Sequence, residues 1–229
     1  MGRKKEYVLL VLLGVIVLAA GGYLFGVWEG YHEASAGYQR LQKYIIERPD
    51  VEQDHERQPD DQEEPEDKLP EIDFDGLRAI NKDIVAWIQI PGIAVDYPVV
   101  QGKDNEHYLH YTFDGKANKA GSIFLDYRNR PDFTDSKVIL YGHNMKDGSM
   151  FSNLKKFENV DFQKNHKTVY LYLPEKTLYM EVIECKRVSM SNAVYDLGIQ
   201  DESGNLEEMI LSTCSVSSNT RLILKCRAL

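Results

Sequence analysis

An uncharged apolar run from Tyr7 to Trp28 dominates the beginning of this 229-residue chain. A helix of that length crosses a hydrocarbon layer of about 30 Å. A core helix of a soluble domain, by contrast, usually keeps one polar face. The run therefore predicts a membrane anchor. A cleaved signal peptide is the alternative, but its apolar region is usually only about 7–15 residues long.

Charges on either side of the run predict how it is oriented. Arg3, Lys4 and Lys5 precede it, Glu29 follows it, and the next basic residue is Arg40. Positive charge next to a membrane span is retained on the cytoplasmic side. We therefore expect a single-pass protein of the cell membrane, with a cytoplasmic N-terminus and the rest of the chain outside.

An acidic segment separates this region from the remainder of the chain. Between Glu47 and Asp67 there are 11 acidic and two basic residues, a net charge of −9, which equals the formal charge of the whole chain. With a single aliphatic residue the segment cannot form a core, which predicts a self-repelling, disordered spacer. No basic stripe suggests nucleic-acid binding. The expected parts are a tip and anchor (1–28), a stalk helix and spacer (29–70), and a folded domain (71–229).

The folded domain is predicted to be mainly β. Leu77, Ile80, Ile84 and Trp87 recur at helical spacing, which suits a short helix leading into a strand. Further helices fit only near 104–113 and 150–159. Short β-rich runs separated by turn residues fill most of the rest and predict a closed or nearly closed barrel. The eight candidate strands are 86–92, 95–100, 121–127, 137–143, 167–174, 177–190, 207–215 and 220–229.

The three cysteines fall into two groups. Cys185 and Cys226 share strand parity with aliphatic neighbours, which predicts small core residues, with a disulfide between them as the alternative. Cys214 instead follows Ser212 and Thr213, which are unusual choices for a dry core.

Cys214 is therefore a candidate nucleophile. A catalytic thiolate needs a cationic or proton-accepting neighbour. Arg221 follows after six residues, and a hairpin of that length would place both side chains near one end of a strand pair. Its guanidinium could stabilise an oxyanion, while an ordinary solvent-exposed arginine is the alternative.

His143 is the best candidate for the proton-transfer partner. It comes directly after the apolar run "KVILYG", where a side chain often reaches a rim, although a purely structural role stays open. No metal or cofactor is predicted: His107 and His110 lie three residues apart on a predicted helix, but no further metal-ligand pattern accompanies them. The other five histidines lie in the stalk, spacer, predicted helix and a loop: His32, His55, His107, His110 and His166.

These residues together resemble the sortase pattern, in which "LYGHNM" is followed by "LSTC" and then by arginine. Residues 80–129 closely resemble the opening of class B sortases, and residues 138–157 resemble their central segment. The likeness covers about residues 71–229, and an N-terminal anchor is also the family's layout. One departure is the connection before the cysteine strand, 191–208, which is shorter than is usual in class B.

The resemblance implies a sortase-like barrel and a cysteine transpeptidase in a Gram-positive cell wall. Cys214 would attack a sorting-signal peptide of a secreted protein, His143 would transfer protons, and Arg221 would hold the oxyanion. The acceptor would be an amine of a peptidoglycan precursor of the lipid II type. The peptide groove is implied to include Asn105, Leu109, Ser212 and Thr213, with core packing for Leu109 and a helix cap for Asn105 as alternatives.

Other functions stay open at this point. A cell-wall cysteine peptidase or amidase would resolve the same acyl-enzyme with water, but such families commonly place the cysteine before the histidine. A sortase that polymerises pilins is a variant of the leading hypothesis. A non-enzymatic binding module is the third alternative, against which Cys214, His143 and Arg221 are all present.

Overall fold

A computed structural model describes residues 2–47, 69–198, 204–214 and 219–229. Eight strands form a closed barrel in the order β10-β8-β7-β3-β4-β5-β6-β9. The predicted fold class is thereby confirmed, and each of the eight candidate runs overlaps one barrel strand, although β3 begins two residues before its run. Their bounds are β3 Ile84–Ile90, β4 Val95–Val100, β5 Ile123–Leu125, β6 Lys137–His143, β7 Thr168–Tyr172, β8 Thr177–Ser189, β9 Glu208–Cys214 and β10 Thr220–Ala228.

Most neighbouring strands are antiparallel, and two pairs are parallel. The parallel pairs are β4 with β5 and β6 with β9. Strands β3 and β4 are joined by a tight turn in which Gly92 has φ +84°, a conformation that glycine adopts without a steric cost. The barrel encloses one large apolar core, to which every strand contributes.

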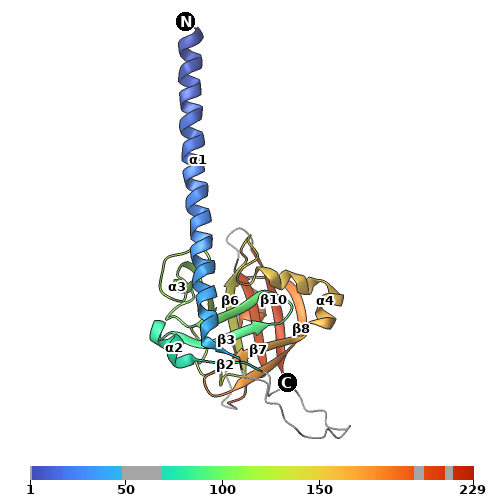
Figure 1. Cartoon of the computed structure of the whole chain (residues 1–229). Helices are drawn as coiled ribbons and strands as arrows, with labels where there is room; N and C mark the ends of the chain where they lie inside the picture. The colour runs from blue at the N-terminus through green and yellow to red at the C-terminus, as the bar shows by residue number, and fades with distance from the viewer. Residues whose placement is uncertain (1, 48–68, 199–203, 215–218) are drawn as a thin grey trace, which may run out of the picture.

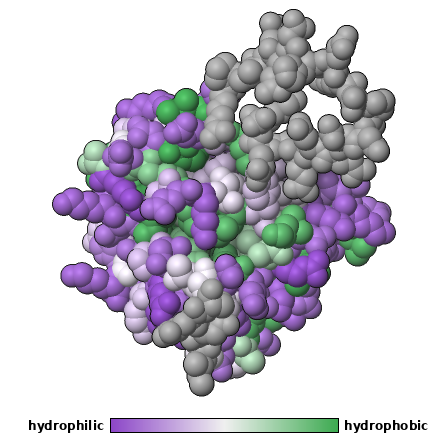
Figure 2. Space-filling model, turned by 90° about the horizontal axis from the view of Figure 1, so that it is seen from below, coloured by the Kyte–Doolittle hydropathy of each residue, from purple (hydrophilic) through white to green (hydrophobic). Residues whose placement is uncertain are grey.

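The N-terminal helix α1 (Gly2–Gln39) projects far from the barrel in Figure 1. Its segment Tyr7–Gly26 has a mean hydropathy of 2.7 and is long and apolar enough to cross a membrane, by length and composition. Most of the exposed large apolar side chains among the described residues lie on this segment. By contrast, the face of the barrel seen from below is largely hydrophilic, with small apolar patches (Figure 2).

The end of α1 packs directly on the barrel. The Tyr38 hydroxyl donates to the Gly121 carbonyl at 2.8 Å, and its ring lies 5.0 Å from that of Phe113. The 3-10 helix η1 (Arg40–Tyr44) follows at once and buries Leu41. The predicted stalk is therefore helical as far as Gln39, and its last turn belongs to the same hydrophobic core as the barrel strands.

A two-stranded sheet flanks the acidic segment. Strand β1 (Ile45–Ile46) is antiparallel to β2 (Glu71–Ile72), and Ile45 lies opposite Ile72. Residues 48–68, which include nearly all of the acidic segment, lie outside the described residues. Its expected disorder and the division of the chain at residue 71 stay predictions.

The short helix α2 (Phe74–Ile80) links this small sheet to the barrel. The Asp73 carboxylate caps it by accepting from the Gly76 amide at 2.8 Å. The helical spacing seen in the sequence therefore applies only as far as Ile80, since Ile84 and Trp87 belong to strand β3 and are buried there.

The remaining helices are short. Two lie where they were predicted, α3 (His107–His110) and the 3-10 helix η3 (Ser152–Glu158). Helix α4 (Val160–Asn165) was not predicted, and it is capped by the Asn159 side chain. The 3-10 turn η4 (Ala193–Tyr195) lies in the short connection between β8 and β9.

All three cysteines are free. Cys226 is fully buried, as expected for a core residue, and Cys185 is half-buried and packs against the same core. The alternative of a disulfide between them is therefore wrong. On β8 strand parity does not decide burial, because Ile183, two residues before Cys185, is 40% exposed.

Candidate functional site

Two parallel strands end side by side at the site. Strands β6 and β9 pair in register from Lys137 with Glu208 to the last pair, His143 with Cys214. Because the carboxyl ends of parallel strands meet at one edge, the candidate base and the candidate nucleophile emerge together. The residue before His143 must be small, since a Cβ on Gly142 would lie 2.4 Å from Ile123 Cδ1 and 2.8 Å from the Phe151 ring.

The third candidate reaches the same edge from the other side of β9. Strand β10 is antiparallel to β9, with Ile223 opposite Ser212. The ladder ends at this pair, and continuing its register by two residues would bring Arg221 opposite Cys214. Its positive charge acts on both other groups, because it lowers the pKa values of the Cys214 thiol and the His143 ring. The fold thus brings all three predicted catalytic residues to one edge of the barrel.

A backbone carbonyl orients the imidazole. His143 Nε2 lies 2.8 Å from the carbonyl oxygen of Leu109. A carbonyl oxygen only accepts, so Nε2 carries the proton and, in the neutral ring, Nδ1 is the proton acceptor. Gly121 permits this close approach: its φ is +56°, and a Cβ there would lie 2.5 Å from the Tyr108 carbonyl and 3.1 Å from His143 Cδ2.

Burial sets the protonation states of the resting pair. It lowers the pKa of His143, and the charges of His110 and Arg221 act in the same direction, against the hydrogen bond to Leu109. Burial also raises the pKa of the Cys214 thiol to about 11, although Arg221 and the Gly142 backbone oppose this. At neutral pH the resting site therefore holds mainly a thiol and a neutral imidazole.

Asn105 does not cap helix α3. Its Nδ2 donates to the Asp126 carboxylate at 3.1 Å, and its Oδ1 accepts from the Tyr127 amide at 3.0 Å. The turn before α3 is instead closed by Asp104, whose Oδ1 accepts from the backbone amides of Glu106 and His107. Of the two sequence interpretations, the helix cap is wrong. Asn105 is half-buried and held from both ends of its amide.

The two hydroxyl residues before Cys214 are buried and already hydrogen-bonded. Ser212 is 1% exposed, and its Oγ lies 2.9 Å from the Tyr195 hydroxyl. Thr213 Oγ1 accepts from the Leu222 amide at 3.1 Å and bonds the Leu222 carbonyl at 3.2 Å. Their polarity, which marked the strand as unusual, thus serves contacts within the domain, directly behind the nucleophile.

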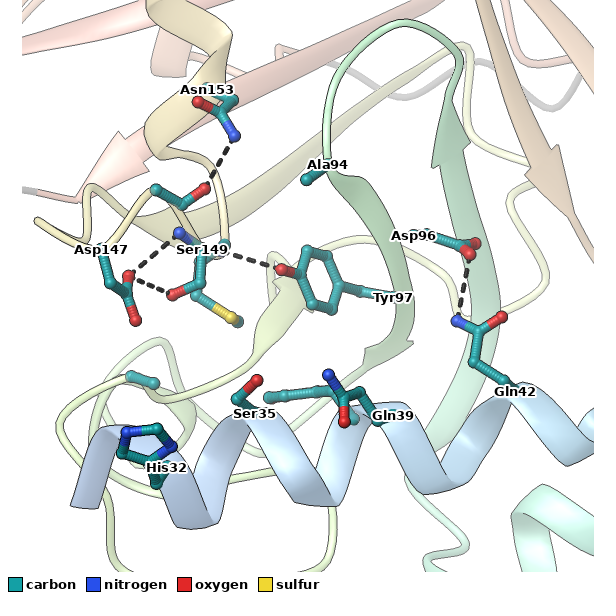
Figure 3. Close-up of a pocket in the computed structure, with 14 residues that line it drawn as sticks. His32, Ser35, Gln39, Gln42, Ala94, Asp96, Tyr97, Asp147, Ser149 and Asn153 are labelled. Atoms are coloured by element: carbon teal, nitrogen blue, oxygen red, sulfur yellow. Dashed lines mark hydrogen bonds between the residues drawn. The ribbon is translucent and has the colours of Figure 1, made fainter. Parts of the chain in front are cut away.

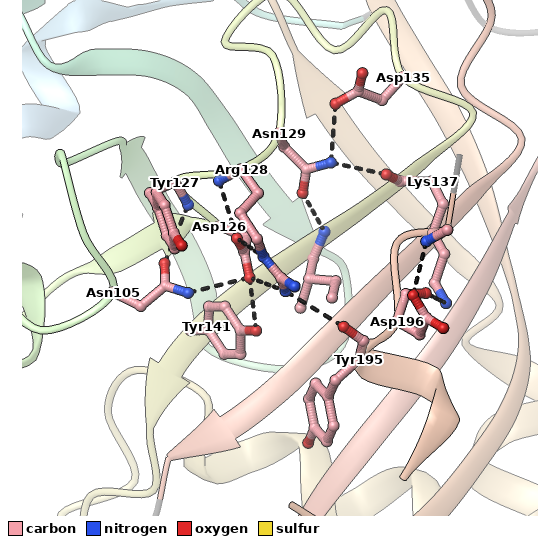
Figure 4. A network of polar contacts seen from close by, with 12 residues as sticks. Asn105, Asp126, Tyr127, Arg128, Asn129, Asp135, Lys137, Tyr141, Tyr195 and Asp196 are labelled. Carbon is pink, nitrogen blue, oxygen red and sulfur yellow. Dashed lines mark hydrogen bonds and ion pairs between the residues drawn. The ribbon is translucent and has the colours of Figure 1, made fainter. Parts of the chain in front are cut away.

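The sequence reasoning missed three contributors to this site. The Leu109 carbonyl carries no side-chain signal, so only the nearby Gly121 hinted at a close backbone approach. The buried carboxylate of Asp126 accepts from the hydroxyl of Tyr141, two residues before His143 on β6, in the polar network of Figure 4. The available signal was Asp126 itself, a carboxylate directly after the apolar strand β5.

Two of the other histidines stack on aromatic rings. The His107 ring stacks on Tyr111 at 4.5 Å, and His166 stacks on Phe162 at 4.0 Å. Within the described parts of the chain, no group of three or more His, Cys, Asp or Glu residues is arranged to hold a metal ion.

A hollow of about 820 Å³ lies elsewhere, between the end of α1 and the loop after β6 (Figure 3). Ser35 and Gln39 face it from the helix, and Tyr97, Asp147 and Ser149 face it from the barrel. None of the three candidate catalytic residues lines it.

Comparison with known proteins identifies relatives of this domain. The family model for the sortase domain matches residues 88–229. Sortase B of Staphylococcus aureus is 33% identical over 169 residues, which cover 73% of this chain and 64% of that protein. Sortase B of Listeria monocytogenes is 50% identical over 92 residues, which cover 40% of this chain and 37% of that protein. The chain thus spans less than two thirds of the length of these two curated relatives.

Solved structures share the fold. A crystal structure of sortase B from Bacillus anthracis in complex with AAEK1 has a TM-score of 0.67 and 26% identity, covering 89% of this chain and 99% of that one. A Staphylococcus aureus sortase B–substrate complex has a TM-score of 0.63 and 26% identity, covering 68% of this chain and 84% of that one.

Proposed function

The chain belongs to the sortase family, and on that premise we propose that it is a membrane-anchored cysteine transpeptidase. It would cleave the C-terminal sorting signal of secreted proteins and transfer the acyl group to an amine of a cell-wall precursor of the lipid II type. The observation that carries the proposal is the final register pair of two parallel strands, His143 with Cys214, beside the charge of Arg221. The N-terminus would lie in the cytoplasm and the barrel outside the cell.

In the first half-reaction, the Cys214 thiolate attacks a carbonyl carbon of the sorting signal. The carbonyl π electrons move to oxygen, and the Arg221 guanidinium donates to that oxyanion. When the tetrahedral intermediate collapses, the C–N bond breaks and the protonated His143 ring gives its proton to the departing amine. The products are a thioester on Cys214 and a peptide amine.

The second half-reaction reverses these roles. The acceptor amine attacks the thioester carbon, His143 takes a proton from it, and the C–S bond breaks to restore the Cys214 thiolate. One amide bond is exchanged for another, so no oxidant or reductant is required. Two acyl transfers through a good leaving group replace one difficult displacement of an amide.

The side chain of His143 is suited to both steps. Its Nε2 proton is held by the Leu109 carbonyl, so the ring keeps one orientation while Nδ1 gains and loses a proton. Arg221 favours the thiolate but disfavours the imidazolium. The reactive ion pair is therefore a minor form of the resting enzyme.

The protonation states predict a broad pH profile. The reactive pair of Cys214 thiolate and His143 imidazolium has one proton fewer than the form in which both groups are protonated. Its fraction is constant between the pKa of His143 and the pKa of Cys214. We expect the rate of acylation to rise through an apparent pKa below 6.5 and to fall only near 11. The measurement is kcat/KM for a sorting peptide from pH 4.5 to 11, together with the rate of Cys214 alkylation by iodoacetamide. Rapid alkylation already at pH 6 would reveal a resting ion pair and contradict this expectation.

The proposed function is tested by the fate of the acyl group. The full chain in detergent is given labelled peptides of the LPXTG and NPQTN types, with and without a glycine-type amine. A thioester adduct on Cys214 and faster release as ligated peptide when amine is present are the expected results. Hydrolysis at a rate that the amine does not change would instead identify a peptidase or amidase.

A further inference from the structure

A buried carboxylate lies at the end of strand β5, behind the site. Asp126 directly follows the apolar residues Ile123–Leu125, and its side chain is fully buried. An ionised carboxylate without partners is very costly to bury. Burial raises the pKa of Asp126, but hydrogen bonds from Arg128 and Tyr141 outweigh this and leave the pKa below its ordinary value. At neutral pH the group is therefore ionised and only accepts hydrogen bonds.

Donors from three separate segments converge on this carboxylate. Oδ1 accepts from the Arg128 amide at 3.0 Å and from its Nε at 2.9 Å, while Oδ2 accepts from its Nη2 at 2.9 Å. Oδ2 also accepts from Asn105 Nδ2 at 3.1 Å and from the Tyr141 hydroxyl at 2.9 Å. One side chain thus joins the loop before α3, the loop after β5 and the middle of β6 (Figure 4).

The network returns to the strand that bears the nucleophile. Tyr141, two residues before His143, is the register partner of Ser212, two residues before Cys214. Arg128 Nη2 donates to the Tyr195 carbonyl at 3.3 Å, and the Tyr195 hydroxyl lies 2.9 Å from Ser212 Oγ. A closed circuit of contacts therefore connects Asp126 with β6, β9 and the turn η4.

The carboxylate also decides which way the Asn105 amide points. Because Asp126 only accepts, the nitrogen of Asn105 must face it, and the oxygen then faces the Tyr127 amide. An amide nitrogen carries two hydrogens, so donation to Asp126 leaves a second one to donate to a peptide carbonyl. A neutral amide at position 126 would lose this selection, since it can present either an oxygen or a nitrogen to Asn105.

We propose that Asp126 is a positioning residue, which fixes Asn105 and the turn η4 relative to Cys214 so that the sorting peptide binds in register. This inference rests on the proposed function and on Asn105 as a groove residue. Asp126 does not act on the acid–base pair directly: the charges that shift His143 belong to His110 and Arg221. Its removal should therefore weaken peptide binding and leave the pH profile unchanged.

The test compares Asp126→Asn with a matched control, Asp135→Asn, in the full chain in detergent. Asp135 is 1% exposed, lies in the loop between β5 and β6, and accepts from Asn129 Nδ2 at 2.9 Å and from the Arg130 amide at 2.7 Å. It is an equally buried carboxylate outside the circuit. Intact mass spectrometry gives the rate of adduct formation on Cys214 as a function of the concentration of a reactive peptide.

For Asp126→Asn we expect the half-saturating peptide concentration to rise about tenfold. The maximal rate of adduct formation should change less than about threefold, and its pH profile should keep both the acidic and the alkaline limb. Asp135→Asn should match wild type. In a double-mutant cycle, adding Asp126→Asn to Asn105→Ala should cause little further loss. If Asp126→Asn does not fold, Tyr141→Phe removes one donor to the carboxylate, keeps the pair with Arg128, and should raise the half-saturating concentration about threefold.

The outcomes separate the two proposals. A wild-type chain that forms no adduct with any peptide would overturn the proposed function, and this inference with it. A wild-type adduct combined with an unchanged half-saturating concentration in Asp126→Asn would overturn the inference alone. The same holds for equal losses in Asp126→Asn and Asp135→Asn, because those would indicate general destabilisation.

Discussion

Replacing Cys214 with alanine is expected to abolish the thioester adduct and to lower the rate of amide exchange by about 10⁴-fold or more. The sulfur is the atom that forms the covalent bond, and neither Ser212 nor Thr213 can replace it, because both hydroxyls are buried and bonded elsewhere. The measurement is intact mass after incubation with a sorting peptide, together with the yield of ligated peptide. The variant should fold, since removal of one half-buried sulfur at a strand end leaves the barrel core intact.

Cys185→Ala is the matched control for this variant. Cys185 is also a half-buried free thiol in a barrel strand, and burial raises its pKa to about 11, as for Cys214. It differs in lying away from His143 and Arg221. The control should form the adduct at the wild-type rate. An adduct that persists in Cys214→Ala, or is lost in Cys185→Ala, would assign the nucleophile to a different residue.

Replacing His143 with glutamine is expected to lower the rate of acylation by about 10²–10⁴-fold, the usual contribution of a positioned general acid and base. Glutamine keeps a hydrogen-bond donor for the Leu109 carbonyl but does not titrate between pH 4 and 11. The acidic limb of the pH profile should therefore disappear along with most of the rate. That second effect separates a proton-transfer role from a loss of packing, which would lower the rate at every pH alike.

His166→Gln provides the comparison. His166 is half-buried, its Nδ1 lies 3.0 Å from the Phe162 carbonyl, and its ring stacks on that residue. The same substitution there disturbs a similar set of contacts at the C-terminal end of helix α4, and activity should be unchanged. A His143→Gln enzyme that keeps both its rate and its acidic limb would exclude His143 as the proton-transfer group.

Most strands of this barrel were predictable from the sequence because they are short apolar runs closed by turn residues. Strand β3, for example, has six of seven residues buried between Asp83 and the turn at Gly92. The helix α4 was missed because its stability comes from the Asn159 cap and the stacking of Phe162 on His166, and little of it from an apolar stripe. Local sequence patterns therefore predict most strands, whereas helix α4 depends on a side-chain cap and a ring contact that such patterns do not show.

The site was predictable in its residues but less so in its geometry. Strand-end positions suggested that His143 and Cys214 reach a rim, but their side-by-side placement depends on the parallel pairing of β6 with β9. No local pattern specifies that pairing, since the two strands are separated by more than sixty residues. The Leu109 carbonyl and the Asp126 circuit were beyond the sequence for the same reason: they depend on which backbone and donor atoms the closed barrel brings together.

The small sheet of β1 and β2 affects how the length of the acidic segment can vary. The chain leaves at Ile46 and returns at Glu71, and these two residues are partners in an antiparallel pair. The distance between the apolar span and the barrel is therefore set by the packed end of α1 at Tyr38 and Leu41 and does not depend on the number of residues between Ile46 and Glu71. The entropic free-energy cost of closing a loop between two paired residues grows only with the logarithm of the number of residues in the loop. With the proposed membrane anchor, insertions and deletions there would leave the height of the candidate catalytic edge above the bilayer unchanged.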